Sequence, residues 1–453
     1  MKHLMTFVSI YLMASQSFLF AQPDTKEGRI YWLSKMWKDV SDNFYDTPKL
    51  EAINWDSLYI SYIPQVESTE KRCDYYGLLS RFMASLHDGH SGFYSRESCD
   101  NESSSYDILP FEIVEANDKF YISSVWKGLA ESIPLGSELL EVEKQSTFDY
   151  LNQFHAPFTN GNTPQTRLKL ALSKFIGGIE NGSIIIKIKT PQGEIRENKV
   201  EFKYGEYRED FLSILPEKRK GTDIFLKQDI NDIPYFYIRF DSFGIKTISN
   251  TLNMITDKVK QADYLVLDLR NNPGGSELIA DSLLMCFLDI DTLKTYKSIT
   301  RINNAYKAAM GYGYKEYKEY YENTVLDTLS ESIRVKENLP LFNQPLFILI
   351  NNETYSAAED LLITLKLHYP DRAIIVGTPT GASTGAPLVR LLSPGVYYRI
   401  CTRGALLPQG LFENGIQPTY YYSSSWEEMV SGEDHIFEFI GEIYNKNNKN
   451  ESK

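Results

Sequence analysis

Three short, almost unbroken apolar runs in the second half of the chain constrain its fold most strongly. Tyr264–Leu269, Leu346–Ile350 and Ala373–Val376 are each followed by a turn, and usually by a helical pattern. Continuous rather than alternating hydrophobicity is typical of strands buried on both faces, as in a mainly parallel sheet covered by crossover helices. The sequence therefore predicts an α/β domain from about Tyr235 onward.

The chain of 453 residues is too long for one hydrophobic core, so further domains are expected. Residues 28–87 carry apolar side chains at helical spacing, which predicts amphipathic helices. After a polar stretch at 100–105, a second unit is predicted to be β-rich, with a hairpin turn at 191–193 and a helix over Thr166–Phe175. Its expected strands are Phe111–Val114, Phe120–Val125, Glu138–Val142 and Ile184–Ile188.

The tyrosine-rich segment 300–335 looks like an insertion in the α/β domain. Its tyrosines stand among lysines and glutamates. Aromatic residues can pack in a core or line a cleft for an extended chain, and composition does not distinguish the two roles. A solvated helical hairpin is the favoured interpretation, with a cleft wall as the alternative.

The first 21 residues have the pattern of a secretory signal peptide. Lys2 precedes an apolar run from Leu4 to Phe20, and Ala21 stands at the expected cleavage site. Leu19 departs from the small residue usual three positions before cleavage, so a retained N-terminal anchor is the alternative. No later stretch approaches the ~18 consecutive apolar residues of a membrane helix. We expect an exported chain, periplasmic or extracellular, with no membrane span after cleavage.

Charge and cysteine content exclude several classes of partner and cofactor. The net charge of −13 opposes binding to nucleic acid or to an anionic membrane surface. The four cysteines are too few for a disulfide scaffold, and no two have the spacing of metal ligands, so no metal or other cofactor is expected. Cys73 and Cys99 could form a bridge in an oxidising compartment, and four reduced cysteines are the alternative.

Ser356 lies where a predicted strand turns into a predicted helix. Glu359, three residues later, completes a capping box, and capping alone would explain both residues. The same turn would expose a hydroxyl at the carboxyl end of a parallel sheet, beside the N–H of Ala357 and a helix N-terminus that favours negative charge. A second turn, Arg270–Gly275, follows another strand and could supply a second N–H. These are the requirements of a nucleophile in acyl transfer.

The turns at 270–275 and 351–359, together with Gly377–Gly381 after the third strand, resemble the tail-specific proteases, also called C-terminal processing peptidases. These are serine peptidases with a Clp/crotonase-like α/β core, and the resemblance covers roughly residues 235–421. It implies that Ser356 is the nucleophile. The implied oxyanion donors are the N–H groups of Gly274 or Gly275 and of Ala357.

The segment 133–142 resembles the turn and strand of a PDZ domain, which captures a peptide by adding it as a strand. The expected fold is therefore multidomain α/β, with a Clp/crotonase-like core, a PDZ-like β-rich domain and an N-terminal helical domain. The expected layout is signal peptide 1–21, helical domain 22–105, PDZ-like domain 106–204, α/β serine peptidase core 205–445 and polar tail 446–453.

One departure from the processing proteases concerns the general base. Those enzymes pair their serine with a lysine about two dozen residues later, but residues 367–445 contain no lysine, and Lys366 lies within the helix after Ser356. The resemblance instead fits the tricorn-like branch, which uses a histidine before the PDZ-like unit and a glutamate after the serine. These roles fall on His90 and Glu413, with His87 as the alternative base.

The implied reaction is an acyl transfer. Ser356 attacks the carbonyl, His90 takes its proton and returns it to the leaving amine, and Glu413 orients the imidazole directly or through a hydroxyl. The tricorn protease has a serine immediately before its histidine, where this chain has Gly89, and Ser91 is the candidate substitute.

The sequence thus predicts an exported serine endopeptidase that cuts extended or unfolded polypeptides. The main alternative is a non-catalytic protein that uses the same fold to bind peptides or apolar ligands. A crotonase-type acyl-CoA enzyme would share the core, but an exported chain would meet little CoA.

Overall fold

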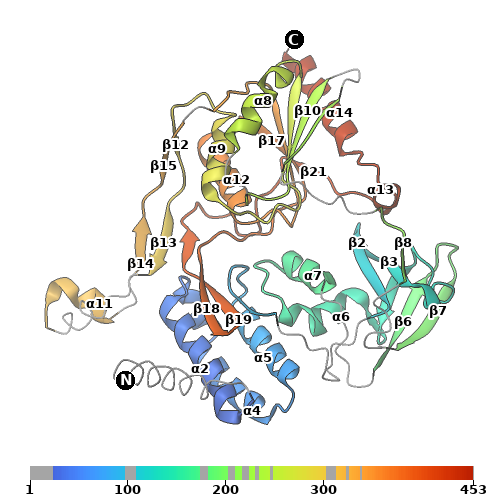
Figure 1. The fold of residues 1–453 in the computed structure, drawn as a ribbon, viewed down its shortest axis with the longest axis vertical. Coiled ribbons are helices and arrows are strands. Elements are labelled where there is room, and N and C mark those ends of the chain that lie inside the picture. The colour runs from blue at the N-terminus through green and yellow to red at the C-terminus, as the bar shows by residue number, and fades with distance from the viewer. Residues whose placement is uncertain are drawn as a thin grey trace, which may run out of the picture.

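The computed structural model describes residues 24–96, 109–173, 182–201, 210–216, 224–229, 234–244, 248–301, 313–322, 326–336 and 339–451. The predicted signal peptide lies outside these residues. Figure 1 shows a mixed α/β chain, in which the α/β layers lie at the top and the N-terminal helices and a β-rich unit lie below them.

The predicted parallel sheet is confirmed. Its strands run in the order β21-β17-β16-β11-β10-β9, and all neighbours from β21 to β10 are parallel, whereas β9 is antiparallel to β10. The central strands are buried along their whole length. The strands are β9 (Ile224–Asp229), β10 (Tyr235–Phe240), β11 (Tyr264–Asp268), β16 (Leu346–Ile350), β17 (Ala373–Gly377) and β21 (Tyr420–Tyr421).

Helices cover both faces of this sheet, which is why its strands have continuous hydrophobicity. Phe236 and Ile238 point into one core, with α8 (Ser249–Val259), α9 (Glu277–Met285) and α12 (Ala357–His368). Tyr235 and Tyr237 point to the opposite face, where α14 (Ile436–Glu451) packs. The short helix α13 (Trp426–Ser431) precedes α14, which extends through most of the segment expected to be a polar tail.

The predicted N-terminal helices are also present, and strands from late in the chain complete their core. The antiparallel sheet β1-β19-β18 packs on the helices, so Tyr398 shares a core with Trp32 and Phe82. This packing fixes the turn between the last helix and β1. The elements are α2 (Lys26–Asn43), α3 (Thr47–Ala52), α4 (Trp55–Ser68), α5 (Arg72–Ala84), β1 (Gly92–Ser95), β18 (Pro387–Ser393) and β19 (Val396–Cys401).

The β-rich unit contains the predicted strands, hairpin and helix around one buried core. Its main sheet has the order β2-β3-β4-β6-β7, with short strands β5 and β8 beside it. The elements are β2 (Phe111–Ala116), β3 (Lys119–Trp126), η1 (Lys127–Leu129), β4 (Glu138–Val142), β5 (Gln145–Ser146), α6 (Thr147–Phe154), η2 (Ala156–Phe158), α7 (Pro164–Ser173), β6 (Ser183–Lys189), β7 (Ile195–Glu201) and β8 (Phe211–Ser213).

For residues 300–335 the described structure differs from the expected helical hairpin, because only 315–322 are helical and the other elements are strands. A two-stranded ribbon, β12 with β15 and β13 with β14, forms an arm beside the α/β layers, and β13 also pairs with β20 (Figure 1). These strands contain β-branched residues, among them Thr292, Ile299 and Ile333, which favour extended structure. The elements are β12 (Thr292–Lys294), β13 (Ser298–Arg301), η3 (Lys315–Tyr317), α11 (Lys318–Glu322), β14 (Leu326–Leu329), β15 (Ile333–Val335) and β20 (Arg403–Ala405).

The cysteines differ from the fully reduced alternative. Cys73 is disulfide-bonded, whereas Cys286 and Cys401 are buried free thiols. Cys99 lies outside the described residues. Within the described ranges, no helix is both long and apolar enough to cross a membrane.

Candidate active site

Ser356 stands at a strained turn before α12. Its backbone has φ 54° and ψ −125°, a conformation that non-glycine residues adopt only where the surrounding structure holds them. Its N–H donates to the carbonyl of Ser383 at 2.9 Å and lies 3.3 Å from a carboxylate oxygen of Glu359. A sharp connection of this kind from strand to helix presents the nucleophile in α/β-hydrolases.

The two turns predicted to cooperate are joined directly by hydrogen bonds. The Tyr355 N–H donates to the carbonyl of Asn272 at 2.8 Å. The Asn271 N–H donates to the side chain of Asn351 at 2.9 Å, and the Asn351 amide donates back to Asn271 at 2.8 Å. The 270–275 turn therefore has a fixed position beside Ser356.

Gly274 lies against the candidate nucleophile. With φ 90°, a Cβ on this residue would be 2.6 Å from the Cβ of Ser356 and 2.8 Å from the Ala357 nitrogen. The Gly274 N–H already donates to the Asn272 side chain at 2.8 Å. By contrast, the N–H groups of Gly275 and Ala357 have no acceptor within the described part of the chain. These two groups are available to bind a substrate oxygen.

His90 lies between Ser356 and a second serine. Its Nε2 is 3.1 Å from the Ser356 Oγ, and its Nδ1 is 2.6 Å from the Ser383 Oγ. The His90 backbone N–H donates to Asp88, and its ring stacks on Tyr355 with centroids 5.9 Å apart. Thus the turn after α5 brings the predicted base to the predicted nucleophile across 266 residues of sequence.

The surroundings of His90 favour its neutral form. Burial lowers the pKa of the imidazole, Asp88 opposes this effect, and Arg399 and Arg403 lower the pKa further. A neutral imidazole can accept a proton from the Ser356 hydroxyl.

Glu359 fixes the loop that carries Ser383. This carboxylate is fully buried and accepts hydrogen bonds from the Thr380 hydroxyl at 2.6 Å and from the N–H groups of Ala382 and Ser383, both at 2.8 Å. Burial raises the Glu359 pKa to about 8, although these donors favour ionisation. Glu359 is therefore more than a helix cap, because it connects the Ser356 turn to the partner of His90.

Tyr355 occupies the space that a side chain at position 89 would need. A Cβ on Gly89 would be 1.6 Å from the Tyr355 hydroxyl and 3.0 Å from the Ser383 Oγ. Ser91, the candidate substitute at Nδ1, instead donates to Asp88 at 2.8 Å. The glycine is thus required by the close approach of Tyr355.

For Glu413 the structure differs from the expectation. Its exposed carboxylate accepts from the Gly410 N–H at 3.2 Å, and no contact with His90 occurs among the described residues. Ser383 holds the Nδ1 position because Glu359 fixes its loop there. The segment that carries Glu413 nevertheless contacts this loop, since the Ile416 N–H donates to the Thr380 hydroxyl at 2.7 Å.

The two alternative bases lie apart from the Ser356 hydroxyl. The Lys366 ammonium donates to the Gln417 carbonyl at 2.8 Å. His87 is exposed, and its carbonyl accepts from the Lys49 side chain. Neither side chain hydrogen-bonds Ser356 in the described structure.

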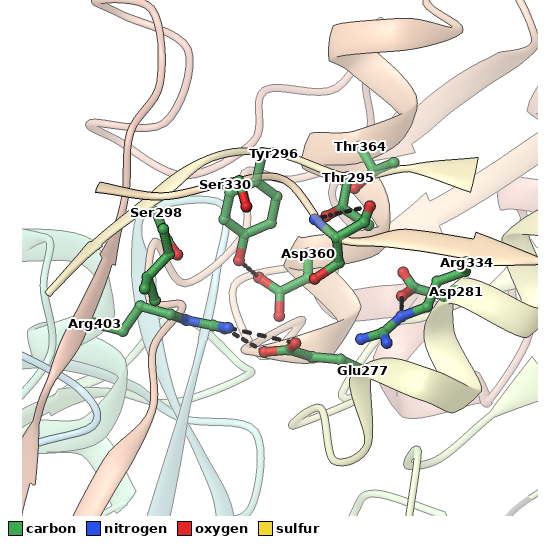
Figure 2. A pocket seen from close by; sticks show the side chains of 12 residues that line it. Glu277, Asp281, Thr295, Tyr296, Ser298, Ser330, Arg334, Asp360, Thr364 and Arg403 are labelled. Atoms are coloured by element: carbon green, nitrogen blue, oxygen red, sulfur yellow. Dashed lines mark hydrogen bonds and ion pairs between the residues drawn. The ribbon is translucent and has the colours of Figure 1, made fainter. Parts of the chain in front are cut away.

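A polar cavity of about 90 Å³ lies between the first turns of α9 and α12 and the arm. Figure 2 shows the Tyr296 hydroxyl directed at Asp360 and the Arg403 guanidinium directed at Glu277. Thr384, next to Ser383, also donates to Asp360. Burial raises the pKa of the Asp360 carboxyl to about 6. Adjacent carboxylates on α12 therefore anchor successive residues of the Ser383 loop. The described residues contain no group of three metal-ligating side chains.

Ser383 and Tyr355 are the site residues that the sequence interpretation missed. Tyr355 is adjacent to the predicted nucleophile, so the turn itself was a signal for it. Ser383 follows the glycine-containing stretch after β17, but no spacing distinguishes it from Thr380 or Thr384.

Comparison with known proteins identifies the family of the α/β domain. Residues 235–422 match peptidase family S41. The chain is 21% identical over 445 residues to a Chlamydia trachomatis protein, covering 68% of this chain and 72% of that protein. It is 25% identical over 208 residues to carboxyl-terminal-processing peptidase 1 of Arabidopsis thaliana, covering 45% of this chain and 36% of the plant protein's length.

The fold is similar to that of mature CPAF complexed with lactacystin. The TM-score is 0.66 at 16% identity, with 90% of this chain and 95% of that chain covered. At this identity, the likeness shows a shared fold. The chain therefore carries a peptidase family S41 domain at residues 235–422 and belongs among the serine-type peptidases.

Proposed function

We propose that this chain is an exported serine endopeptidase that hydrolyses extended or unfolded polypeptides through an acyl-enzyme formed on Ser356. The observation that carries the proposal is the 3.1 Å approach of the His90 Nε2 to the Ser356 Oγ. A capping serine needs no histidine, whereas a nucleophile needs a base within hydrogen-bond reach.

The proposed reaction follows from this geometry. His90 accepts the Ser356 proton at Nε2 while its Nδ1–H donates to the Ser383 hydroxyl, and Ser356 Oγ bonds to the substrate carbonyl carbon. The N–H groups of Gly275 and Ala357 stabilise the resulting oxyanion. His90 then protonates the leaving amine, and water attacks the ester by the same route, which frees Ser356 and the carboxylate product.

Two features support export and an extended substrate. The disulfide at Cys73 is typical of oxidising compartments, which agrees with the signal-peptide pattern at residues 1–21. The β-rich unit, whose segment 133–142 resembles a PDZ turn and strand, contacts the turn that carries His90. A unit of this kind could hold an unfolded chain beside the site.

The direct test combines digestion with labelling. The purified mature protein should degrade casein, with new product ends visible by mass spectrometry, and a serine-directed fluorophosphonate should modify Ser356. A protein that binds unfolded casein without cutting it, and that resists the label, would instead be the non-catalytic binding protein.

Ser383→Ala is expected to lower kcat by about 10- to 100-fold, because the imidazole loses the partner that orients Nδ1. Glu413→Gln should change kcat by less than about threefold, since its carboxylate contacts Gly410 rather than His90. Steady-state kinetics on one peptide substrate measures both. The reverse ranking would restore Glu413 as the orienting group and remove Ser383.

The pH dependence should reflect the burial of His90. Only the neutral imidazole acts as a base, and burial lowers its pKa, so kcat/KM should fall at acid pH with a midpoint below the ordinary value of about 6.5. Because the unfolded chain binds that proton more readily, folding stability should also decline as pH falls below about 6.5. Initial rates should therefore be measured with the fold monitored by circular dichroism. A midpoint above 7 would show that another group titrates.

A further inference from the structure

We propose that Asn160 and Asn162 of the β-rich unit are positioning residues for His90, the base of the peptidase site. This inference rests on the proposed function. Both residues belong to the segment between η2 and α7, and both bond to the backbone on either side of His90.

Asn162 holds the residue before His90. The Gly89 N–H donates to the Asn162 Oδ1 at 2.7 Å. Gly89 carries no side chain, and Tyr355 fills the space where one would lie, so no side chain at position 89 can hold this turn in place. The amide oxygen of Asn162, from the β-rich unit, holds it instead by accepting the Gly89 N–H.

Asn160 contacts the residue after His90, and here the asparagine is the hydrogen-bond donor rather than the acceptor. Its Nδ2 donates to the carbonyl of Ser91 at 2.7 Å and lies 3.4 Å from the carbonyl of Gly89. One asparagine therefore accepts and the other donates, and the two contacts bracket His90. Ser91 is fully buried, so water cannot replace the Asn160 amide as the hydrogen-bond donor to its carbonyl.

Helix α7, which follows this segment, contacts the loop on the other side of the imidazole. The Thr166 hydroxyl donates to the carbonyl of Gly381 at 3.2 Å, in the loop that presents Ser383. The β-rich unit thus contacts the supports of both His90 and its Nδ1 partner. Because a displacement of about 1 Å can cost about 100-fold in rate, these contacts bear on turnover and not only on domain docking.

Because Asn162 accepts a hydrogen bond and Asn160 donates one, aspartate should be tolerated at position 162 but not at position 160. Asn162→Asp keeps an acceptor for the Gly89 N–H, so kcat should stay within about threefold, whereas the isosteric Asn162→Leu should lose about 10- to 100-fold. Asn160→Asp replaces the donor by a carboxylate facing two carbonyl oxygens, so it should lose at least as much as Asn162→Leu.

Asn152→Asp is the matched control. Asn152 lies on α6 of the same unit, and its Nδ2 also donates to a backbone carbonyl, that of Phe148 at 3.0 Å, without contacting His90. It should retain wild-type kcat. Two readouts are used, namely kcat and KM on a short peptide and the rate at which a fluorophosphonate labels Ser356, with thermal melts to confirm folding.

The inference is supported if Asn162→Asp keeps its activity while Asn162→Leu and Asn160→Asp lose it. The losses should appear in kcat and in the labelling rate rather than in KM. Equal effects of aspartate at both positions, or losses confined to KM, would overturn it and leave the asparagines as docking contacts. Should Asn160→Asp fail to fold, the Asn162 pair decides alone. A wild-type protein that neither cuts nor labels would instead overturn the proposed function.

Discussion

Ser356→Ala is expected to reduce peptide-bond hydrolysis by about 10⁵- to 10⁶-fold, the scale on which serine peptidases respond to removal of the nucleophile. Ser383 cannot replace it, because among the described contacts the Ser383 hydroxyl faces the Nδ1 of His90 and not the Nε2. The strained backbone at φ 54° remains in the variant, so the fold should lose no more than about 1–2 kcal/mol. Casein digestion and chemical denaturation measure the two effects.

Ser425→Ala is the matched control for the capping role. Ser425 begins α13 with a complete capping box, in which its Oγ accepts from the Glu428 N–H at 3.2 Å and the Glu428 carboxylate accepts from the Ser425 N–H at 2.7 Å. This variant should lose about 1 kcal/mol of stability and no activity. Comparable activity losses in both variants, or residual activity in Ser356→Ala, would mean that Ser356 serves as a cap.

Local signals explain which parts of the site could be predicted from the sequence. Ser356 and the 270–275 turn each follow an apolar run that is typical of a strand covered on both faces, and the positions of such turns at the sheet edge follow from the parallel order. His90 was identified from its turn and from a resemblance, because a histidine carries no periodic signal.

Contacts between distant segments explain what could not be predicted. Ser383 meets His90 across 293 residues, and its loop is fixed by Glu359, whose sequence context fits a helix cap equally well. Glu413 stands at the right place in the order of motifs, yet order does not determine which way a carboxylate on an exposed turn points. The strands β12 to β15 were missed because they are short and pair with one another and with β20 rather than with the main sheet.

His90→Ala is expected to lose about as much activity as Ser356→Ala, about 10⁵- to 10⁶-fold, because an unassisted hydroxyl is a weak nucleophile at neutral pH. Lys366→Ala should change turnover by less than about threefold, since its ammonium binds the Gln417 carbonyl. His87→Asn is the control for the alternative base, because asparagine tolerates the positive φ of 44° at that position. It should be nearly as active as the wild type.

The double variant Ser356→Ala/His90→Ala tests whether the two residues act as one unit. A base has no proton to accept once the hydroxyl is absent, so the double variant should be no slower than either single variant. Losses that multiply would show two independent functions, and a large loss in Lys366→Ala with an active His90→Ala would assign the proton to lysine. The non-additive result is the one expected of a histidine that reaches Ser356 from the N-terminal helices, because the base and the nucleophile act in the same step and their atoms lie 3.1 Å apart.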